Sequence, residues 1–492
     1  MNRYYSALWP LLIALFITHQ SSAEGTNELQ RLKEELRGAR AELENVINTQ
    51  KRLIDQLQAR IEALENRAGT PAAGSAKPAA DPGKLVAGSG NERASDTDAL
   101  NTGGDSTNRV PTSLLQTGRA YLNLSLSGLF AAGASTAEDI SITQPGAHDP
   151  NQNGFTVQNV EMTLTGAVDP YFRGQSSLIF QIDREGESKF ELEEAFLETT
   201  SLPGNLQVKA GQYFTEFGRL NTMHPHAWAF VDTPLVNARF LGPDGLRNPG
   251  ARVSWLAPLP FYSEFFAGLQ DGHGETAHSF GSTHEEELFF GRAHTARRAN
   301  ALDDLIFSTR YAASLDLTPS QTILFGGSFA TGGNASGEDA NTQIYGLDLF
   351  WKWKPAKAHA GFPFVSWQTE GMYRRYEAVA WLSEPGEGGA VIDLPSEVFQ
   401  DYGFYSQISY GFTRRWVAAL RGEYLWEETS PHFADPQRGD RWRLSPNLTW
   451  FPSEFSKIRL QYNFDRRENA GSDHSIWLQF EFNLGAHSAH QF

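Results

Sequence analysis

The feature that most constrains this chain is a strict alternation of apolar and polar residues along most of its length. In residues 475–484, SIWLQFEFNL, one side carries Leu478 and Phe480 and the other carries Gln479 and Glu481. Successive side chains of a β-strand point to opposite faces of the sheet. The alternation therefore predicts long strands that separate an apolar medium from a polar one.

Sixteen segments follow this pattern, and the connections between them differ systematically in length. The predicted strands lie near residues 119–131, 155–166, 173–184, 190–199, 206–214, 250–257, 261–270, 305–317, 321–330, 342–354, 364–380, 399–412, 416–428, 441–452, 457–467 and 474–485. One set of connections is short and rich in turn residues, as in SLPGN and LTPSQ, whereas the other set is mostly longer. This asymmetry, with an even number of strands, is typical of outer-membrane β-barrels.

We therefore predict an all-β fold, namely a 16-stranded antiparallel transmembrane β-barrel over residues 118–492, preceded by an N-terminal coiled-coil helix. A closed barrel leaves no strand edge unpaired in lipid. A large soluble β-sandwich or propeller is the alternative, because it also alternates, but it does not account for the loop asymmetry.

The N-terminal residues read as a secretory signal peptide over 1–23. Arg3 supplies a positive charge, an apolar run follows over residues 8–17, and small residues lead up to Ala23. The apolar run is short for a membrane-spanning helix. We therefore expect an exported chain whose barrel lies in the outer membrane of a Gram-negative cell.

A heptad repeat follows the signal peptide. One row of residues is spaced by seven and is leucine at all but one position, namely Leu29, Leu36, Leu43, Gln50, Leu57 and Leu64. This spacing predicts a coiled coil over residues 24–67, on the periplasmic side of the membrane. We expect it to join protomers into a homotrimer, and a tether to the cell wall is the alternative. Residues 68–117 are rich in Ala, Gly, Ser and Pro and predict a flexible linker.

The composition excludes several function classes. A net charge of -17 argues against nucleic acid as a partner. The partner that we expect, outer-membrane lipid, follows from the predicted barrel. The absence of cysteine excludes a thiolate metal site and a cysteine nucleophile. No G-x-S-x-G, H-E-x-x-H or P-loop pattern occurs, so we do not expect an enzyme.

Two groups of motifs carry a family resemblance. The segment EEAFLETTSLPGNLQVKAGQYFTEFGRL, residues 193–220, resembles a hairpin of the phosphate-selective porin O and P family. HPHAWAFVDTPLVNARFLGPDGLRNPGARVSWL and the terminal HSIWLQFEFNLGAHSAHQF resemble a group labelled zinc-regulated outer-membrane receptors. The resemblance implies a porin-type barrel whose third long loop narrows the lumen.

The third long connection, residues 215–249, is the candidate constriction. Its polar residues are Glu216, Arg219, His224, His226, Asp232, Arg239, Asp244 and Arg247. Opposed acidic and basic groups across a constriction filter solutes by charge and size. The alternative is that these side chains only attach the loop to the barrel wall. A metal site formed by His224 and His226, with Asp232 as a third ligand, is also compatible with the spacing.

The fourth long connection is the second candidate for metal binding, because histidine with carboxylate suits Zn²⁺. Its candidate ligands are His273, His278, His284, Glu285 and His294. The alternative is a solvated external loop.

The sequence thus predicts a porin-type channel for passive diffusion of small hydrophilic solutes or ions, without a resident cofactor. A zinc or divalent-metal uptake channel and an envelope tether are the alternatives.

Overall fold

The computed structural model describes residues 113–117, 120–272, 275–281, 288–293, 302–337, 339–359, 361–383, 391–435 and 437–485. The chain divides into two compact units between Gly90 and Asn91, and the described residues all belong to the second unit. The predicted signal peptide over 1–23, the predicted coiled coil over 24–67 and most of the predicted linker over 68–117 lie outside the described residues.

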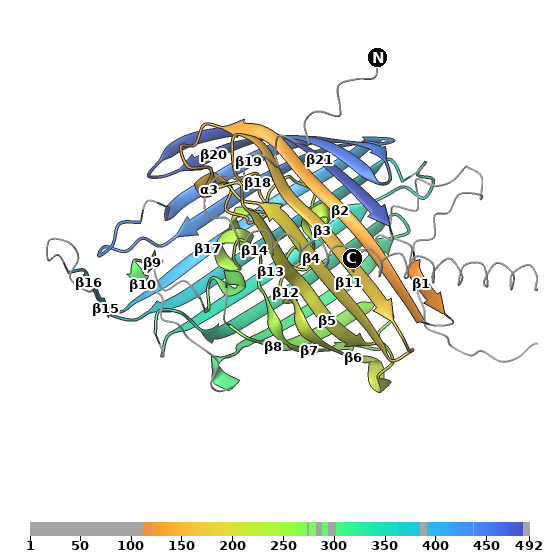
Figure 1. The fold of residues 1–492 in the computed structure, drawn as a ribbon, viewed down its shortest axis with the longest axis horizontal. Helices are drawn as coiled ribbons and strands as arrows, with labels where there is room; N and C mark the ends of the chain where they lie inside the picture. Colours follow the sequence, from red (N-terminus) through yellow and green to blue (C-terminus); the bar gives the residue numbers. More distant parts are fainter. Residues whose placement is uncertain are drawn as a thin grey trace, which may run out of the picture. The chain divides into compact units, whose positions relative to one another are not determined.

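The described residues form strands with a few short helices between them (Figure 1). The long strands are β2 (Ala120–Ser135), β3 (Gly154–Ala167), β4 (Phe172–Ile182), β5 (Ser188–Thr199), β6 (Leu206–Phe214), β7 (Arg247–Leu256), β8 (Tyr262–Gln270), β11 (Ile306–Thr318), β12 (Gln321–Gly333), β13 (Asn341–Trp353), β14 (Phe364–Ala378), β17 (Glu397–Thr413), β18 (Trp416–Glu427), β19 (Gly439–Ser453), β20 (Ser456–Arg467) and β21 (Gly471–Gly485). The short strands are β1 (Ser113–Thr117), β9 (Leu288–Phe289), β10 (Arg292–Ala293), β15 (Trp381–Leu382) and β16 (Asp393–Leu394). The helices are α3 (Ile140–Thr143), α4 (Leu235–Phe240) and the 3-10 turns η2 (Pro203–Asn205), η3 (Pro225–Ala227), η4 (Glu275–Ala277) and η5 (Leu302–Asp304).

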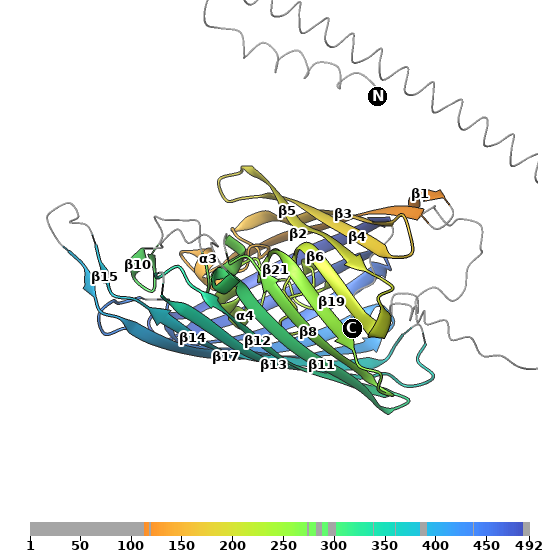
Figure 2. The ribbon, with the colours of Figure 1, turned by 90° about the horizontal axis from the view of Figure 1, so that it is seen from below.

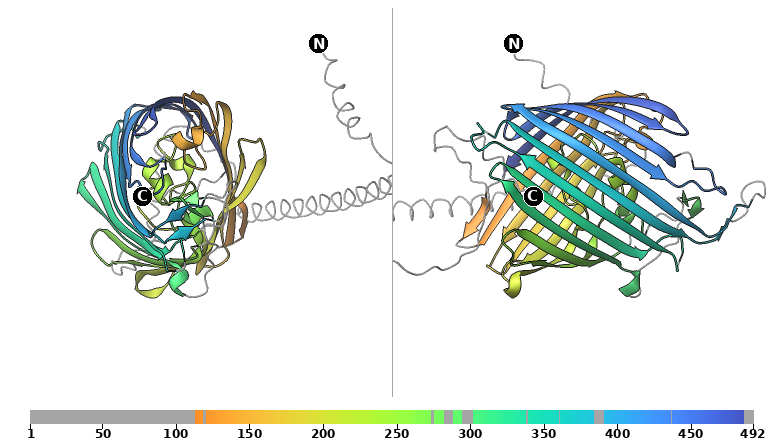
Figure 3. Two further views of the ribbon diagram at one scale, coloured as in Figure 1. Left: turned by 90° about the vertical axis from the view of Figure 1, so that its left-hand side faces the viewer. Right: turned by 180° about the vertical axis from the view of Figure 1, so that it is seen from behind.

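The long strands close into a barrel. Each pairs antiparallel with the next along the chain, and β2 completes the ring by pairing with β21 from Ser125↔Gly485 to Ser135↔Ser475. Figures 1 and 3 show the resulting ring of tilted strands, and Figure 2 shows it from below. Among the described residues the ring has sixteen strands, which confirms the predicted all-β, 16-stranded antiparallel barrel.

The alternating residues of each strand divide between the outer and the inner face of the barrel. On β21, Leu478 and Phe480 are 49% and 43% exposed, whereas Gln479 and Glu481 are 1% and 3% exposed. The exposed side chains face outward from the ring and the buried ones face the lumen, because neighbouring residues of a strand point to opposite faces. The barrel therefore has an apolar exterior and a polar interior.

Each of the sixteen predicted strands is present, with ends that differ by a few residues. The largest extensions lie at the long-loop end, where β2 continues to Ser135 and β7 begins at Arg247. Pairing explains them, because both residues continue a ladder: Ser135 pairs with Ser475 and Arg247 with Phe214. Arg247, predicted to lie in the third loop, is therefore a residue of the barrel wall.

Short turns at one end of the barrel follow local sequence. The turn between β5 and β6 is Pro203–Asn205, in which Gly204 and Asn205 have φ of 72° and 58°. Glycine and asparagine tolerate this left-handed conformation best, so the SLPGN sequence directs a tight reversal. Among the described residues no helix is long and apolar enough to cross a membrane.

Strand β1 lies within the range predicted as linker. Its residues pair with the start of β2, from Ser113↔Asn123 to Thr117↔Ala120. The pairing of β2 with β21 begins only at Ser125. β1 therefore pairs with the first residues of β2, which β21 does not reach.

Candidate functional site in the barrel lumen

The connection between β6 and β7, residues 215–246, folds into the barrel and is called the lumenal segment below. The left view of Figure 3, which looks into the barrel, shows this yellow-green segment inside the ring of strands. Its apolar side chains pack with residues of the wall and of the connection between β8 and β11 into a buried cluster. The cluster comprises Phe217, Leu235, Val236, Phe240, Leu241, Leu246, Ala277, Phe280, Ile306, Ala330, Ile344, Met372, Tyr405 and Leu425. The lumenal segment is therefore held in part by an apolar core of its own.

Wall side chains also bind the backbone of the lumenal segment. The amide of Leu220 donates to Glu370 at 2.8 Å, and the amide of Leu235 donates to Glu423 at 2.6 Å. From another part of the wall, Arg459 donates to the carbonyl of Phe230 at 3.1 Å. Buried backbone groups require such partners, so these wall side chains determine where the segment lies.

Asp232 is the most enclosed acidic residue of the lumenal segment. Arg421 donates to it at 2.5 Å, Arg443 lies 3.4 Å away, and the amides of Gln461 and Asn463 donate at 2.8 and 2.7 Å. Burial alone would raise the pKa of Asp232, but the two arginine charges hold that pKa below its ordinary value. Asp232 thus attaches the segment to β18, β19 and β20, and it is not beside the histidines as a third ligand.

The other charged residues of the lumenal segment are also paired with the wall. Arg239 bonds to Glu427 at 3.0 Å, and Glu216 accepts from Arg252 at 2.9 Å. The Arg219 guanidinium lies over the ring of Phe350, 4.1 Å from its centre. These contacts agree with the alternative in which the loop is attached to the wall.

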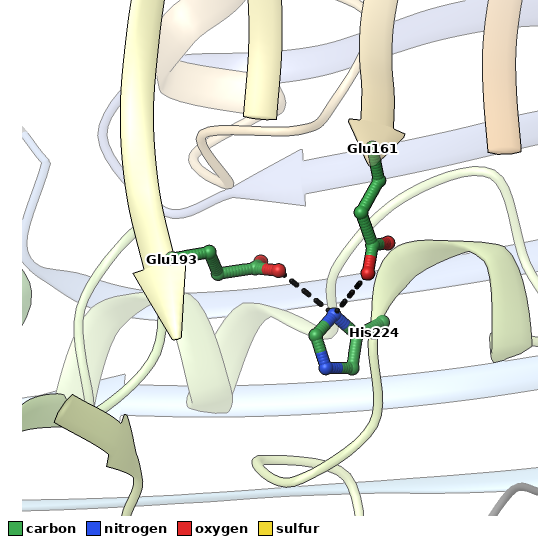
Figure 4. A group of neighbouring side chains, drawn as sticks. All are labelled: Glu161, Glu193 and His224. Carbon is green, nitrogen blue, oxygen red and sulfur yellow. Dashed lines mark ion pairs between the residues drawn. The ribbon is translucent and has the colours of Figure 1, made fainter. Parts of the chain in front are cut away.

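The two histidines of the HPH motif meet a group of wall carboxylates, and Figure 4 shows His224 with two of them, Glu161 and Glu193. His224 Nδ1 lies 2.8 Å from Glu193 and 3.1 Å from Glu161, and its Nε2 lies 3.0 Å from Glu194. His226 Nδ1 lies 2.9 Å from the other oxygen of Glu161. Burial alone would lower the pKa of His224, but Glu161 and Glu193 raise it well above the ordinary value. We call His224, His226, Glu161, Glu193 and Glu194 the histidine–glutamate cluster.

A break in the β5 ladder places two of these carboxylates side by side. Ser177 pairs with Glu194 and Leu178 pairs with Leu192, so Glu193 has no partner across the ladder. This is a β-bulge, which re-aims a side chain. As a result Glu193 and Glu194 are both buried toward the lumen, although successive strand residues ordinarily point to opposite faces.

A further histidine lies next to the cluster. His148, in the connection between β2 and β3, has its Nε2 2.8 Å from Asp244 and 3.9 Å from Glu193. Burial alone would lower the pKa of His148, but Asp244 and the nearby glutamates raise it to about 9. Asp244 also bonds to Arg247 at 2.6 Å, so this group ties two connections to the start of β7.

A cavity of about 320 Å³ leads to the histidine–glutamate cluster from the short-turn end of the barrel. Its outer part is lined by Tyr121, Arg173 and Glu198, near the turns, and its inner part by His224 and His226. Four members of the cluster, namely Glu161, Glu194, His224 and His226, therefore line this cavity.

Comparison with known proteins supports a family assignment. A protein of Aquifex aeolicus (strain VF5), described as an uncharacterized protein, is 30% identical over 358 residues, which cover 69% of this chain and 71% of that protein. The chain belongs to the same family as this Aquifex protein. No family model matches the chain.

Several solved structures are similar to this chain, and their names describe outer-membrane channels or porins. The outer membrane channel DcaP of Acinetobacter baumannii has 10% identity and a TM-score of 0.48, covering 75% of this chain and 99% of that chain. An anion-selective porin from Comamonas acidovorans has 8% identity and a TM-score of 0.45, covering 74% and 100%. The barrel assignment rests on the strand pairing of the chain itself.

Most candidate ligands of the fourth loop lie outside the described residues, namely His273, His284, Glu285 and His294. The ring of His278 packs edge-on against Phe289, with the ring centres 4.5 Å apart. Nearby in the same connection, Arg292 donates to the carbonyls of Val379 and Pro395, at 2.8 and 2.6 Å. The described part of this connection is thus packed against the barrel.

Four residues of this candidate site are absent from the sequence-based candidates: Glu161, Glu193, Glu194 and His148. The three glutamates belong to strands, where the sequence predicts only that polar residues line the lumen. The doubled glutamate in FELEEAFLE is a usable signal, because it breaks the alternation and so indicates a bulge.

Proposed function

We propose that this protein is an outer-membrane channel of the porin type, which passes small hydrophilic solutes or ions by passive diffusion. The observation that carries the proposal is the closed barrel with an apolar exterior and a polar interior. A β-sheet is stable in lipid only when closed, because every backbone group must be paired within the protein. A soluble barrel would have no reason to expose so many large apolar side chains.

Aromatic residues at the short-turn end support the membrane assignment. Trp255, Trp416 and Trp450 are outward-facing and lie near the turns, and the rings of Trp416 and Trp450 stack with centres 6.1 Å apart. Such residues gather where the hydrocarbon region meets water. They therefore support one interfacial belt, at the short-turn end of the barrel.

The lumenal segment supports a narrow rather than a wide passage. At its level the wall charges are buried and paired, as in Arg374 with Asp401 at 2.6 Å and Arg310 with Asp348 at 2.6 Å. The short-turn cavity adds several carboxylates to the route. We therefore propose passage of small species only, with a weak preference for cations.

Membership of the phosphate-selective porin O and P family, or of the group labelled zinc-regulated outer-membrane receptors, is part of the same proposal. It is supported by the motifs over 193–220 and 224–256. Assembly into a homotrimer, with a periplasmic coiled coil over 24–67, also remains a proposal and is supported by the heptad repeat.

Conductance in planar bilayers tests the channel. We expect the purified protein to give discrete, small conductance steps, and we expect larger steps from a variant in which residues 221–244 are replaced by a short Gly-Ser linker. Heat-denatured protein is the control for detergent leakage. Absence of steps from the unmodified protein would contradict the proposal even if the variant conducts, because a lumen that is closed at rest is not a passive channel.

A further inference from the structure

The three carboxylates of the histidine–glutamate cluster form ion pairs with histidines alone among the described residues. Glu161, Glu193 and Glu194 are all buried and converge on His224. Within the part of the chain that the structure describes, none of the three forms an ion pair with lysine or arginine. Carboxylates taken out of water are costly unless a cation compensates them. The cluster therefore favours an occupant that carries positive charge.

Two groups at the centre of the cluster, His224 and Glu193, form a buried ion pair, with His224 Nδ1 2.8 Å from the Glu193 carboxylate. Glu193 is 0% exposed, so water does not compensate its charge freely. Its only other ion-pair contact among the described residues is His148, at 3.9 Å. A buried carboxylate that relies on histidine alone leaves room for a metal cation as a further partner.

Glu194 orients the histidine ring from behind. It lies 3.0 Å from His224 Nε2, on the opposite edge of the ring from Glu161 and Glu193. A carboxylate that accepts from one ring nitrogen fixes the tautomer and turns the lone pair of the other nitrogen toward a metal ion. In this arrangement Nδ1 of His224 is the ring nitrogen that meets the two remaining carboxylates (Figure 4).

The spacing of the ligand atoms fits a small divalent ion. One oxygen of Glu161, one of Glu193 and one nitrogen of His224 all lie within 4.8 Å of one another. Ligand atoms around tetrahedral Zn²⁺ are about 3.3 Å apart, given bonds of about 2.0–2.2 Å. The separations of 2.8 and 3.1 Å between His224 Nδ1 and the two carboxylates need to open only slightly. Strands β3 and β5 hold the two carboxylates, so the site is largely formed in advance.

We propose that His224, Glu161 and Glu193 bind a divalent cation of the Zn²⁺ class at the inner end of the short-turn cavity. Mixed imidazole and carboxylate ligands favour Zn²⁺ and similar ions over Mg²⁺ and Ca²⁺, which prefer oxygen alone. This inference deepens the proposed channel function and rests on it, because His224 and Glu161 line the short-turn cavity and an ion bound there would lie beside that space. Its binding test does not require conductance, so the two proposals fail separately.

Calorimetric titration of the full chain in detergent micelles tests the site. After treatment with a chelator, we expect ZnCl₂ to bind at one saturable site per chain and MgCl₂ to give no binding at the same concentrations. Glu193→Gln preserves the shape of the side chain and removes its charge, and we expect it to weaken Zn²⁺ binding at least about tenfold. Zinc X-ray absorption is expected to show nitrogen and oxygen ligands, with an imidazole contribution that His224→Gln removes.

Glu198→Gln is the matched control, because Glu198 lies on the same strand as Glu193, lines the cavity that leads to His224 and is paired with Arg173. We expect this variant to keep the Zn²⁺ affinity of the unmodified protein. The mobility shift of folded barrels on unheated gels establishes that each variant is folded. Absence of saturable Zn²⁺ binding would mean that a proton is the only occupant and would overturn the proposal. Binding that survives Glu193→Gln but is lost when His273, His278, His284 and His294 are replaced together would overturn it as well.

Discussion

Removing the charge of Asp232 is expected to release the lumenal segment from the β18–β20 wall. Asp232→Asn keeps the size of the side chain but leaves the guanidinium groups of Arg421 and Arg443 without this buried partner. Each arginine retains one carboxylate, Glu423 at 2.8 Å and Asp465 at 2.9 Å, respectively. Breaking a buried ion pair on one side costs about 3–5 kcal/mol, and the retained partners favour the lower end. A cost of about 3 kcal/mol raises the released population roughly a hundredfold.

Hydrogen exchange measures this release directly. The amide of Val231 donates to Gln461 at 2.8 Å and the amide of Leu235 donates to Glu423 at 2.6 Å, so both are protected only while the segment is docked. We expect both amides to exchange roughly a hundredfold faster in Asp232→Asn, while amides of the strand ladder keep their rates. Single-channel records are expected to become noisier for the same reason.

Asp393→Asn is the control for this prediction, because Asp393 is exposed and lies in the short β15–β16 pair. The same chemical change there is expected to alter stability by less than about 0.5 kcal/mol. The reasoning is refuted if Val231 and Leu235 exchange at unchanged rates in Asp232→Asn, since the ion pairs would then contribute nothing to docking. Equal acceleration of the whole ladder would also refute it, because that result indicates global unfolding.

Two further predictions address the exterior and the pH dependence. Leu347 is 74% exposed at the middle of β13. Leu347→Arg would be neutral in a soluble protein, but in a bilayer we expect it to lower the free energy of unfolding by about 2–4 kcal/mol. Equilibrium folding into lipid vesicles measures this change, and a neutral result would contradict a lipid-facing exterior. Because the pKa of His148 is raised from 6.5 to about 9, its pairing with Asp244 is fully present below pH 6.5 and is lost as the pH rises through 9. The shift corresponds to about 3 kcal/mol of stabilising free energy. Hydrogen exchange of residues 146–149, compared at pH 6 and pH 10, measures the loss of this stabilisation. A pH profile identical to that of His148→Gln would show that another group is responsible.

The barrel can be predicted from the sequence because its pattern is local. Whether a residue faces lipid or lumen depends on its parity within a strand, and parity follows from a few neighbours, as in Leu478 and Gln479. The predicted strand ends are less accurate at the long-loop side. There, a ladder such as that of β6 and β7 continues to the pair Phe214↔Arg247, because both strands stay extended side by side. The local sequence of one strand does not show how far its partner stays paired.

The candidate site is harder to predict because its contacts are distant in sequence. His224 meets Glu161 and Glu193, which lie on separate strands, and no local spacing connects the three. The HPH motif itself is conspicuous, but the carboxylate that its spacing suggests as a third ligand is Asp232. In the fold Asp232 instead forms ion pairs with Arg421 on β18 and Arg443 on β19.

The small strand β1 determines how the barrel bears a mechanical load. Any tension on the chain before Ser113 reaches the wall through the β1–β2 pair, in which Ser113 sits opposite Asn123 at the open end of the hairpin. A pull on Ser113 therefore separates the pairs one after another instead of shearing them together. This short ladder would yield before the ring of sixteen strands, so a force applied from the N-terminal side would lengthen the chain and leave the barrel closed.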